Sequence, residues 1–498
     1  MSTRKLKILF VTSEAIPFVK TGGLADVSAA LPKMLTEMGH EVRLVIPKYG
    51  AVDERKFKVH DIIRLKDISI KIGDKDVVFS LKSCFLPGVR TRVQIYFLEN
   101  YEYFGNRNSL YIDPKTGKDY NDNDERFILL NRSIMEMIIK LGWIPDIVHL
   151  NDWQCGLVPA YAKTIYKDCE GFDKLKILFT IHNLAYQGKF PQSSFKKTGL
   201  PDSLDSEKKG IIHQGKLNFL KSGLIFSDVI NTVSETYSVE IRTKNEYGEG
   251  LKDILAKRKD KLFGILNGID LNIWHPEKDK LIPYNYSVKT LDKKVDNKIY
   301  LLERFGLKYD QNIPLIGVIS RLYDSKGIDL IQKAFSDLMK LNLQFILLGT
   351  GDMKYHSFFE KMSMKYPEKF SCYLGFSDEL AHMIEAGADM FLMPSKYEPC
   401  GLNQMYSLVY GTIPIVRETG GLADTVEKYN EKTGEGTGFV FKKYEASDLV
   451  SEVKRAIKVY NNKDAWLKLM KVAMNQDFSW KSSAKKYIDL YRKILSED

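Results

Sequence analysis

The sequence lacks the apolar run of about 18 residues that a membrane-spanning helix needs. Because its first strand-like run begins at Leu6, we expect no secretion signal or transit peptide. Cysteine is scarce, and no two residues form a C-x-x-C pair among Cys84, Cys155, Cys169, Cys372 and Cys400. An odd number at these spacings argues against a disulfide framework or a zinc knuckle. We therefore expect a protein of the reducing cytoplasm.

A block of charge of one sign is also missing. The net charge is +10, but the lysines are spread along the chain among many aspartates and glutamates. Dispersed charge of this kind is typical of a solvated surface and gives no reason to expect a nucleic-acid or membrane partner. It leaves room for a local basic site that binds a small phosphorylated ligand.

What the sequence does contain is a repeated alternation of apolar runs and helical patterns. The first example joins the run Ile8–Val11 to a glycine loop, a helical pattern over Leu24–Met38 and a second strand, EVRLVIP. Similar apolar runs recur in both halves of the chain. Because continuous apolar strands that alternate with helices indicate parallel sheets buried on both faces, we predict an α/β fold with two doubly wound halves.

The length of the chain favours two domains, because a single hydrophobic core stops growing at roughly 250–300 residues. We predict a first domain at residues 1–262 and a hinge at 263–276, where a strand gives way to a glycine turn and irregular sequence. A second domain is predicted at residues 277–476, followed by a terminal helix at 477–498.

The hexapeptide TGGLAD occurs twice, at Thr21–Asp26 and at Thr419–Asp424. Each copy follows a strand-like run and opens a helical pattern, so each should lie at the carboxyl edge of a parallel sheet, where such folds bind ligands. Backbone N–H groups and the positive end of a helix dipole are then available to an anion. One glycine pair alone is more often a structural turn, but two copies suggest phosphate recognition by both domains.

Two cations share one loop in the stretch ISRLYDSKG. Arg321 and Lys326 follow a strand-like run, where a guanidinium fork and an ammonium can bind one diphosphate together. Ordinary surface cations are the alternative. The D-x-D triplets at Asp74–Asp76 and Asp122–Asp124 lie in polar sequence, and we interpret them as solvated turns. Cationic side chains, not a divalent metal, are therefore expected to neutralise a leaving diphosphate.

Three further polar residues follow strand-like runs. Asp152 ends the run in DIVHLND, where capping of the next helix is one role and catalysis is another. His182 ends the run in LFTIH; the alternative is a satisfied buried histidine, but its place at a strand end favours a ligand site. Glu398 follows DMFLMP and precedes Pro-Cys-Gly, where a carboxylate can accept hydrogen bonds from sugar hydroxyls.

Five motifs in order, KTGGLADV, HNLAYQG, SRLYDSKG, EPCGL and TGGLADTV, make the chain resemble bacterial glycogen synthases and plant starch synthases. The resemblance extends from the first strand to the helix that begins with DFSW. It implies a retaining glucosyltransferase of the GT-B fold, with two Rossmann-like domains that face each other across a deep cleft. It also implies that the terminal helix crosses back to the first domain.

The resemblance implies roles for particular residues. The residues expected to act on the reacting sugar and its leaving group are His182, Arg321, Lys326, Glu398 and Asp152. The residues expected to bind the nucleotide-sugar donor are Lys20, Gly22, Gly23, Asp26, Phe376, Cys400, Gly401, Leu402, Thr419, Gly420 and Gly421. Lys20 would reach the diphosphate and the second glycine pair would offer amides to the distal phosphate. The two TGGLAD copies would then be halves of one clamp.

Three positions refine the resemblance. Phe376 stands where relatives often carry a tyrosine that stacks on the nucleobase, so the stacking ring is kept and the hydroxyl is lost. Cys400 matches a family cysteine and is interpreted as a neighbour of the site, not a nucleophile. Tyr406 stands where many other GT-B enzymes carry a second glutamate, which favours glycogen and starch synthases over sucrose or trehalose-phosphate enzymes.

The reaction implied by the resemblance moves glucose from ADP-glucose to the non-reducing 4-hydroxyl of an α-1,4-glucan with retention of the α configuration, for glycogen biosynthesis. The expected partners are ADP-glucose, with UDP as the alternative nucleotide, and a glycogen or maltooligosaccharide acceptor; no cofactor is expected. Two other functions stay open, a sugar-nucleotide epimerase on the same fold and a non-catalytic glucan-binding protein. The retained charges of Lys20, Arg321, Lys326 and Glu398 favour an active transferase.

Overall fold

The computed structural model describes residues 4–88 and 92–496, which form two compact units. The first unit consists of Met1–Val233, Ser238–Ile265 and Trp480–Asp498, and the second of Ser234–Tyr237 and Leu266–Ser479. The chain leaves the first unit after Ile265, early in the segment 263–276 that the sequence marks as a hinge. The terminal helix α18 (Trp480–Ser496) belongs to the first unit.

A ten-stranded sheet forms the centre of the first unit, in the order β15-β14-β10-β9-β1-β2-β6-β5-β3, with β4 paired to β5. The strands are β1 (Lys7–Val11), β2 (Glu41–Pro47), β3 (His60–Asp61), β4 (Ile68–Ile72), β5 (Lys75–Phe85), β6 (Gln94–Glu99), β9 (Ile147–Asn151), β10 (Lys176–Ile181), β14 (Val229–Thr232) and β15 (Leu262–Gly264). Neighbours from β15 to β6 are parallel, which is the arrangement expected from their apolar runs.

The other edge of this sheet, made of β3, β4 and β5, is antiparallel, and none of these three strands is among the apolar runs from which parallel strands are predicted. Along β4, buried isoleucines alternate with exposed Ser69 and Lys71, so one face of the strand meets solvent. Strands with one solvent-exposed face are common in antiparallel sheets. By contrast, Ile8–Val11 of β1 are buried on both faces of the sheet, as expected for its parallel central part.

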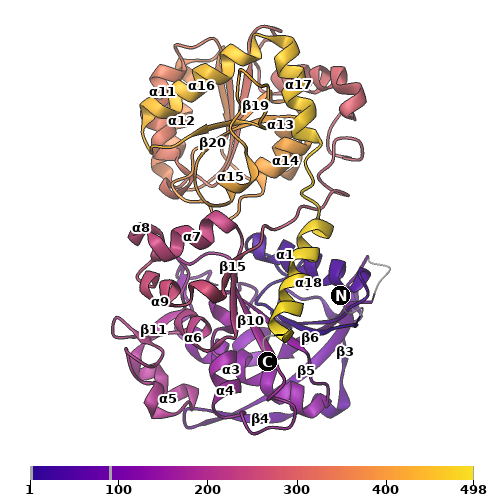
Figure 1. The fold of residues 1–498 in the computed structure, drawn as a ribbon, viewed down its shortest axis with the longest axis vertical. Coiled ribbons are helices and arrows are strands. Elements are labelled where there is room, and N and C mark those ends of the chain that lie inside the picture. The colour runs from indigo at the N-terminus through magenta and orange to yellow at the C-terminus, as the bar shows by residue number, and fades with distance from the viewer. Residues whose placement is uncertain (1–3, 89–91, 497–498) are drawn as a thin grey trace. The chain divides into compact units, whose positions relative to one another are not determined.

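Helices and short strands surround this sheet (Figure 1). The helices are α1 (Gly23–Glu37), α2 (Glu54–Phe57), α3 (Asn123–Leu141), α4 (Val158–Lys163), α5 (Phe195–Thr198), α6 (Phe219–Phe226), α7 (Glu235–Thr243), α8 (Asn245–Gly248), α9 (Lys252–Lys257) and α18. Two small sheets add β7 (Ile112–Asp113) with β8 (Lys118–Asp119), and β11 (Lys189–Pro191), β12 (Ile212–His213) and β13 (Lys216–Asn218).

Two tyrosines explain why the last helix belongs to the first unit. The Tyr491 hydroxyl lies 2.8 Å from Nδ1 of His149 on β9, and the Asn231 amide on β14 donates to the Tyr487 hydroxyl at 3.0 Å. Both tyrosine rings are fully buried. Buried hydroxyls that find partners fix α18 on the sheet.

The second unit contains a six-stranded parallel sheet in the order β18-β17-β16-β19-β20-β21. Its strands are β16 (Leu315–Ile319), β17 (Gln344–Leu348), β18 (Phe370–Tyr373), β19 (Met390–Met393), β20 (Ile413–Arg417) and β21 (Phe439–Phe441). Its helices are α10 (Lys294–Arg304), α11 (Ile328–Leu338), α12 (Met353–Lys365), α13 (Asp378–Gly387), α14 (Asn403–Val409), α15 (Gly420–Thr425), α16 (Ala446–Tyr460) and α17 (Lys463–Met474).

Successive residues of this sheet point into two separate cores. On β17, Phe345 and Leu347 join a core with α11, α12 and α16, whereas Ile346 and Leu348 join a core with α10 and α13. In Figure 1, α11, α12 and α16 accordingly lie on the side of the sheet away from α13. Apolar residues at every position of a strand are therefore explained by helices on both faces.

In the second unit, β16, β17 and β18 follow one another from the centre of the sheet to one edge, and β19, β20 and β21 follow one another from the centre to the opposite edge. This is the strand order of a Rossmann sheet. The predicted α/β class with two Rossmann-like, doubly wound units is confirmed. Among the helices of the described residues, none is both long enough and apolar enough to span a membrane.

Candidate active site

The first TGGLAD copy follows β1 and runs into the first turn of α1, which begins at Gly23. The Thr21 N–H donates to the carboxylate of Glu14 at 2.5 Å, the Thr21 hydroxyl donates to it at 2.8 Å, and the Gly22 N–H also donates to it. Burial raises the pKa of Glu14, and these hydrogen bonds oppose that rise. The expectation that this loop offers its amides to an external anion is wrong for Thr21 and Gly22, because an internal carboxylate accepts them.

Lys20 and Asp26 flank this loop and form an ion pair with 2.8 Å between Nζ and Oδ1. Their side chains are 53% and 32% exposed, so solvent reaches both charges. Asp26 lies in the first turn of α1, which begins at Gly23. The Lys20 ammonium is thus held beside the amino end of a long helix, where an anion is favoured.

Asp152 and His182 lie at the carboxyl ends of the adjacent strands β9 and β10. The backbone of Asp152 has φ 58° and ψ −179°, a strained conformation that is essentially confined to glycine. Its Oδ1 accepts the N–H of His182 at 2.7 Å and makes no capping bond to the turn Trp153–Cys155. The capping role considered for Asp152 is therefore wrong, and its carboxylate is fixed at the edge of the sheet.

Asn151 fixes the ring of His182. The Asn151 amide nitrogen donates to the carbonyl of Val11 at 3.0 Å, so its oxygen is the atom that faces Nε2 of His182 at 3.0 Å, and Nε2 carries a proton. Burial lowers the pKa of His182 to about 4 and raises the pKa of Asp152 to about 7. At neutral pH the imidazole is uncharged and the carboxyl group titrates, as a proton-handling residue requires.

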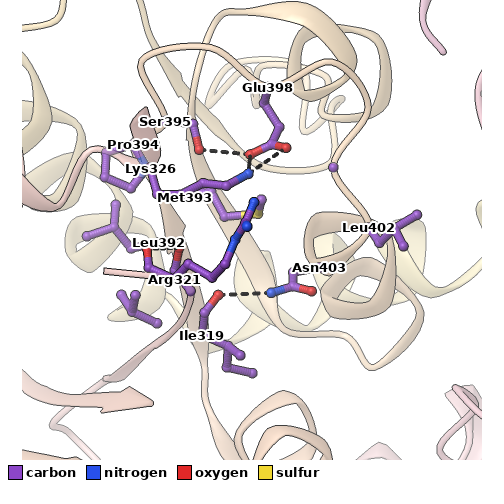
Figure 2. Close-up of a pocket in the computed structure, with 13 residues that line it drawn as sticks. Ile319, Arg321, Lys326, Leu392, Met393, Pro394, Ser395, Glu398, Leu402 and Asn403 are labelled. Atoms are coloured by element: carbon purple, nitrogen blue, oxygen red, sulfur yellow. Dashed lines mark hydrogen bonds and ion pairs between the residues drawn. The ribbon is translucent and has the colours of Figure 1, made fainter. Parts of the chain in front are cut away.

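The second unit has a pocket of about 160 Å³ at the carboxyl ends of β16 and β19, the two strands between which the strand order reverses. Open α/β sheets bind ligands at this switch point. Figure 2 shows the pocket, which is lined by Val318, Ile319, Ser320, Arg321, Lys326, Leu392, Met393, Pro394, Ser395, Glu398, Gly401, Leu402 and Asn403. It therefore brings together five residues of the sequence-based site: Arg321, Lys326, Glu398, Gly401 and Leu402.

An ion pair dominates the pocket. Lys326 Nζ donates to Oε1 and Oε2 of Glu398 at 2.9 and 2.7 Å, and the Ser395 hydroxyl donates to Oε2 at 3.0 Å (Figure 2). The Glu398 side chain is 8% exposed and the Lys326 side chain 25%. The nearly buried carboxylate is thus satisfied by hydrogen bonds from an ammonium and a hydroxyl.

Arg321 supplies a second cation to the same pocket. Arg321 is exposed and lies two residues after the end of β16, and its guanidinium carbon lies 5.9 Å from the centre of the Tyr323 ring. Asn403 also lines the pocket, and its side-chain amide donates to the carbonyl of Ile319 at 2.9 Å, which connects the start of α14 to the end of β16. Two cations beside one carboxylate suit a ligand with both phosphate and hydroxyl groups.

The second TGGLAD copy packs behind the Glu398 turn. The Gly421 N–H donates to the carbonyl of Glu398 at 3.0 Å, so the expectation that this amide is offered to a phosphate is wrong. A Cβ on Gly420 would lie 2.0 Å from the carbonyl oxygen of Glu398, and one on Gly421 would lie 1.9 Å from that of Cys400. Close approach of two backbones requires these glycines.

Phe376 and Cys400 differ in their exposure to solvent. Phe376 follows β18 and is 85% exposed, outside the residues that line the pocket. Cys400 is buried beside Glu398, and burial raises the pKa of its thiol to about 12. A protonated, buried thiol is a poor nucleophile.

Across residues 4–88 and 92–496, no cluster of three or more histidine, cysteine, aspartate or glutamate side chains is placed to hold a metal ion. The interpretation of Asp122–Asp124 as a solvated turn is wrong in detail. Arg107 forms two 2.7 Å hydrogen bonds with Asp122, and Lys197 pairs with the buried Asp124 at 2.8 Å. These carboxylates serve structural ion pairs, because each already has a cationic partner.

Sequence reasoning missed four residues of the two sites: Glu14, Asn151, Ser395 and Asn403. Glu14 and Asn151 carried a usable signal, because each lies at or just after the carboxyl end of a buried strand. Ser395 and Asn403 flank the Glu398 motif and contribute through hydrogen bonds that no sequence pattern specifies.

Comparisons with known proteins agree with this arrangement. Residues 7–257 match the family described as starch synthase catalytic domain, and residues 302–468 match the family described as glycosyl transferases group 1. The chain is 44% identical over 495 residues to a glycogen synthase of Thermosipho africanus, with 99% of this chain and 100% of the relative covered. It is 43% identical over 494 residues to a glycogen synthase of Clostridioides difficile, with 98% and 100% covered.

A solved structure extends the match to the fold. The catalytic domain of starch synthase IV from Arabidopsis thaliana, bound to ADP and acarbose, superposes with a TM-score of 0.85 at 31% identity, covering 99% of this chain and 100% of that one. Two Rossmann-like units with charged groups at their switch points define a glycosyltransferase of the GT-B class. Within this class the chain belongs to the starch synthase catalytic domain family, and it is an enzyme of glycogen or starch synthesis. The epimerase and the non-catalytic binding protein are thereby set aside.

Proposed function

We propose that the enzyme transfers glucose from ADP-glucose to the non-reducing 4-hydroxyl of an α-1,4-glucan and keeps the α configuration. The observation that carries this proposal is the single pocket that holds Arg321, Lys326 and Glu398. Two cations suit the diphosphate of the donor, and the carboxylate suits the hydroxyls of its glucose. The full-length similarity to glycogen synthases supports the same donor and acceptor classes.

In the proposed reaction the bond between C1 of glucose and the diphosphate oxygen breaks while the acceptor oxygen attacks C1 from the same face. The acceptor proton passes to the departing phosphate oxygen, so atoms and charge balance. Arg321 and Lys326 stabilise the negative charge that grows on the diphosphate, a role in which fixed cations act most strongly in the transition state. No metal ion is needed in this scheme, because the two side chains supply the positive charge.

Residues of the first unit act on the sugar in this proposal. Neutral His182 donates its Nε2–H to Asn151, so its other nitrogen can accept a hydrogen bond from a glucose hydroxyl without adding charge. Asp152 is fixed at the strand end by the His182 N–H and is placed to contact the reacting sugar or the acceptor. Lys20 is proposed to reach the diphosphate by exchanging Asp26 for phosphate. The free thiols of all five cysteines suit a reducing compartment, and we propose the cytoplasm as the site of action.

Turnover on glycogen with ADP-glucose and with UDP-glucose tests the proposal. We expect glycogen-dependent release of ADP, slower release of UDP, and newly added glucose in α-1,4 linkage by proton NMR. Donor consumption without glucan elongation, or a β-linked product, would contradict it.

A further inference from the structure

The turn that carries Glu398 is held in place by residues of the neighbouring strand and of the second TGGLAD copy. It follows β19 and leads into α14, so its own chain fixes only its two ends. We propose that Arg417 and the glycine pair Gly420–Gly421 are positioning residues that set the carboxylate of Glu398 for the glucose of the donor. This inference rests on the proposed function, in which Glu398 holds that glucose.

The register of the sheet puts Arg417 beside this turn. Met393, the last residue of β19, pairs with Val416, so the next residue of β20, Arg417, lies level with the start of the turn. Arg417 is 7% exposed, and its Nε donates to the carbonyl of Ser395 at 2.8 Å. A second guanidinium nitrogen donates to the carbonyl of Lys396. One planar fork therefore holds two consecutive carbonyls in a fixed geometry, which the single nitrogen on the flexible stem of a lysine does not reproduce.

The two residues that Arg417 holds connect to both charged groups of the pocket. The Ser395 hydroxyl donates to Oε2 of Glu398 at 3.0 Å. The Lys396 N–H donates to the carbonyl of Ser325, the neighbour of Lys326, at 2.9 Å. A shift of the Ser395–Lys396 backbone would therefore move the carboxylate relative to the ammonium.

The glycine pair holds the other end of the same turn. The Gly421 N–H bonds to the carbonyl of Glu398 itself, and the φ of Gly420 is 43°. Because any Cβ would lie about 2 Å from the carbonyl oxygens of Glu398 or Cys400, side chains at these positions would push the turn away. The second TGGLAD copy thus acts through the backbone of Glu398 by close packing.

The decisive experiment compares R417K, E398Q and the double variant, with R455K as a matched control. Arg455 also holds a backbone carbonyl, that of Tyr429, and pairs with Glu431 and Glu452 in the same unit, away from the Glu398 turn. Each variant is assayed for kcat/KM with ADP-glucose on glycogen and for the Kd of ADP by calorimetry. ADP lacks glucose, so its affinity reports the phosphate site and the integrity of the unit.

We expect R417K to lower kcat/KM about 10- to 100-fold while the Kd of ADP changes less than about threefold, because misplaced groups reduce transition-state contacts. We expect R455K to change neither quantity. In the E398Q background, R417K should lower kcat/KM almost no further, because the effects of residues that act through one group are not additive.

Three results would overturn the inference: full activity of R417K, equal losses in R417K and R455K, or additive losses in the double variant. A G421A variant gives a second measurement, for which we expect loss of turnover with retained ADP binding. If E398Q itself keeps full activity, the proposed role of Glu398 fails instead. The two failures are therefore distinguishable.

Discussion

Lys326 and Glu398 are 72 positions apart in the chain, and their charged groups meet in one pocket with Nζ 2.9 and 2.7 Å from the two carboxylate oxygens. A diphosphate that binds Lys326 must compete with this carboxylate. In the proposed reaction, displacement of the ammonium leaves Glu398 able to accept hydrogen bonds from sugar hydroxyls. In the proposed function the pair would therefore couple the phosphate and sugar halves of donor recognition.

The first prediction concerns Lys326. K326A should lower kcat about 10²- to 10³-fold and raise KM for the donor less, because charge on the diphosphate grows as its bond to glucose breaks. K333A is the matched control, since Lys333 also pairs with an aspartate but is 66% exposed on α11. Steady-state kinetics that give both variants the same kcat would show that Lys326 is an ordinary surface cation.

R321K should also lose activity, because lysine lacks the planar fork.

The second prediction concerns the pH dependence of stability. Burial raises the pKa of Asp152 from 3.8 to about 7, so between these values the folded protein keeps a proton that the unfolded chain has released. The free energy of unfolding of the wild type, relative to D152N, should therefore fall as pH rises through this window, by on the order of 4 kcal/mol, and then level off. Urea denaturation of both proteins across the window measures the difference. A difference that rises with pH would contradict the assignment.

The third prediction concerns Phe376. If its exposed ring stacks on the nucleobase, F376A should raise KM for the donor about tenfold, because base–aromatic stacking contributes about 1–3 kcal/mol. F376Y should keep the wild-type KM or lower it, since the ring remains. M364A serves as a control for loss of an equally exposed apolar side chain on α12. Unchanged donor KM in F376A would remove this residue from the donor site.

The fourth prediction concerns Cys400. Its thiol is buried and has a pKa raised to about 12, so iodoacetamide should leave it unmodified in the native protein at neutral pH. The partly exposed Cys169 should react first, as peptide mass mapping would show. C400S should keep activity within about threefold, because the thiol is not a nucleophile in the proposed reaction. Loss of turnover with retained fold would contradict that role.

The fifth prediction concerns metal ions. Activity should remain within about twofold in excess EDTA, because Arg321 and Lys326 supply the positive charge that a divalent ion would otherwise bring. The measurement is initial rate with and without chelator on the same preparation. Complete loss that Mg²⁺ or Mn²⁺ restores would show that the cationic pair is insufficient.

The sequence by itself determined the class of fold and the strand ends at which the candidate site residues lie. In β1 the four residues Ile8–Val11 are all apolar and buried, and helices on both faces of a parallel sheet explain that pattern. Asp152, His182, Arg321 and Glu398 could be singled out because each follows such a strand, and carboxyl ends share one edge of a sheet. The apolar runs and the polar residues that follow them are both local features of the chain, so they can be recognised in a single sequence.

Only the tertiary structure decided which hydrogen-bond partner each polar group takes. Glu14 accepts the amides of the first TGGLAD loop, and the Glu398 carbonyl accepts the Gly421 amide of the second, so two loops of identical sequence have different partners. The antiparallel edge of the first sheet is likewise a result of the tertiary structure, which shows that Ser69 and Lys71 of β4 are exposed to solvent. The reason is physical: a buried donor bonds to whatever acceptor packing brings within reach, and packing depends on residues far away in the chain.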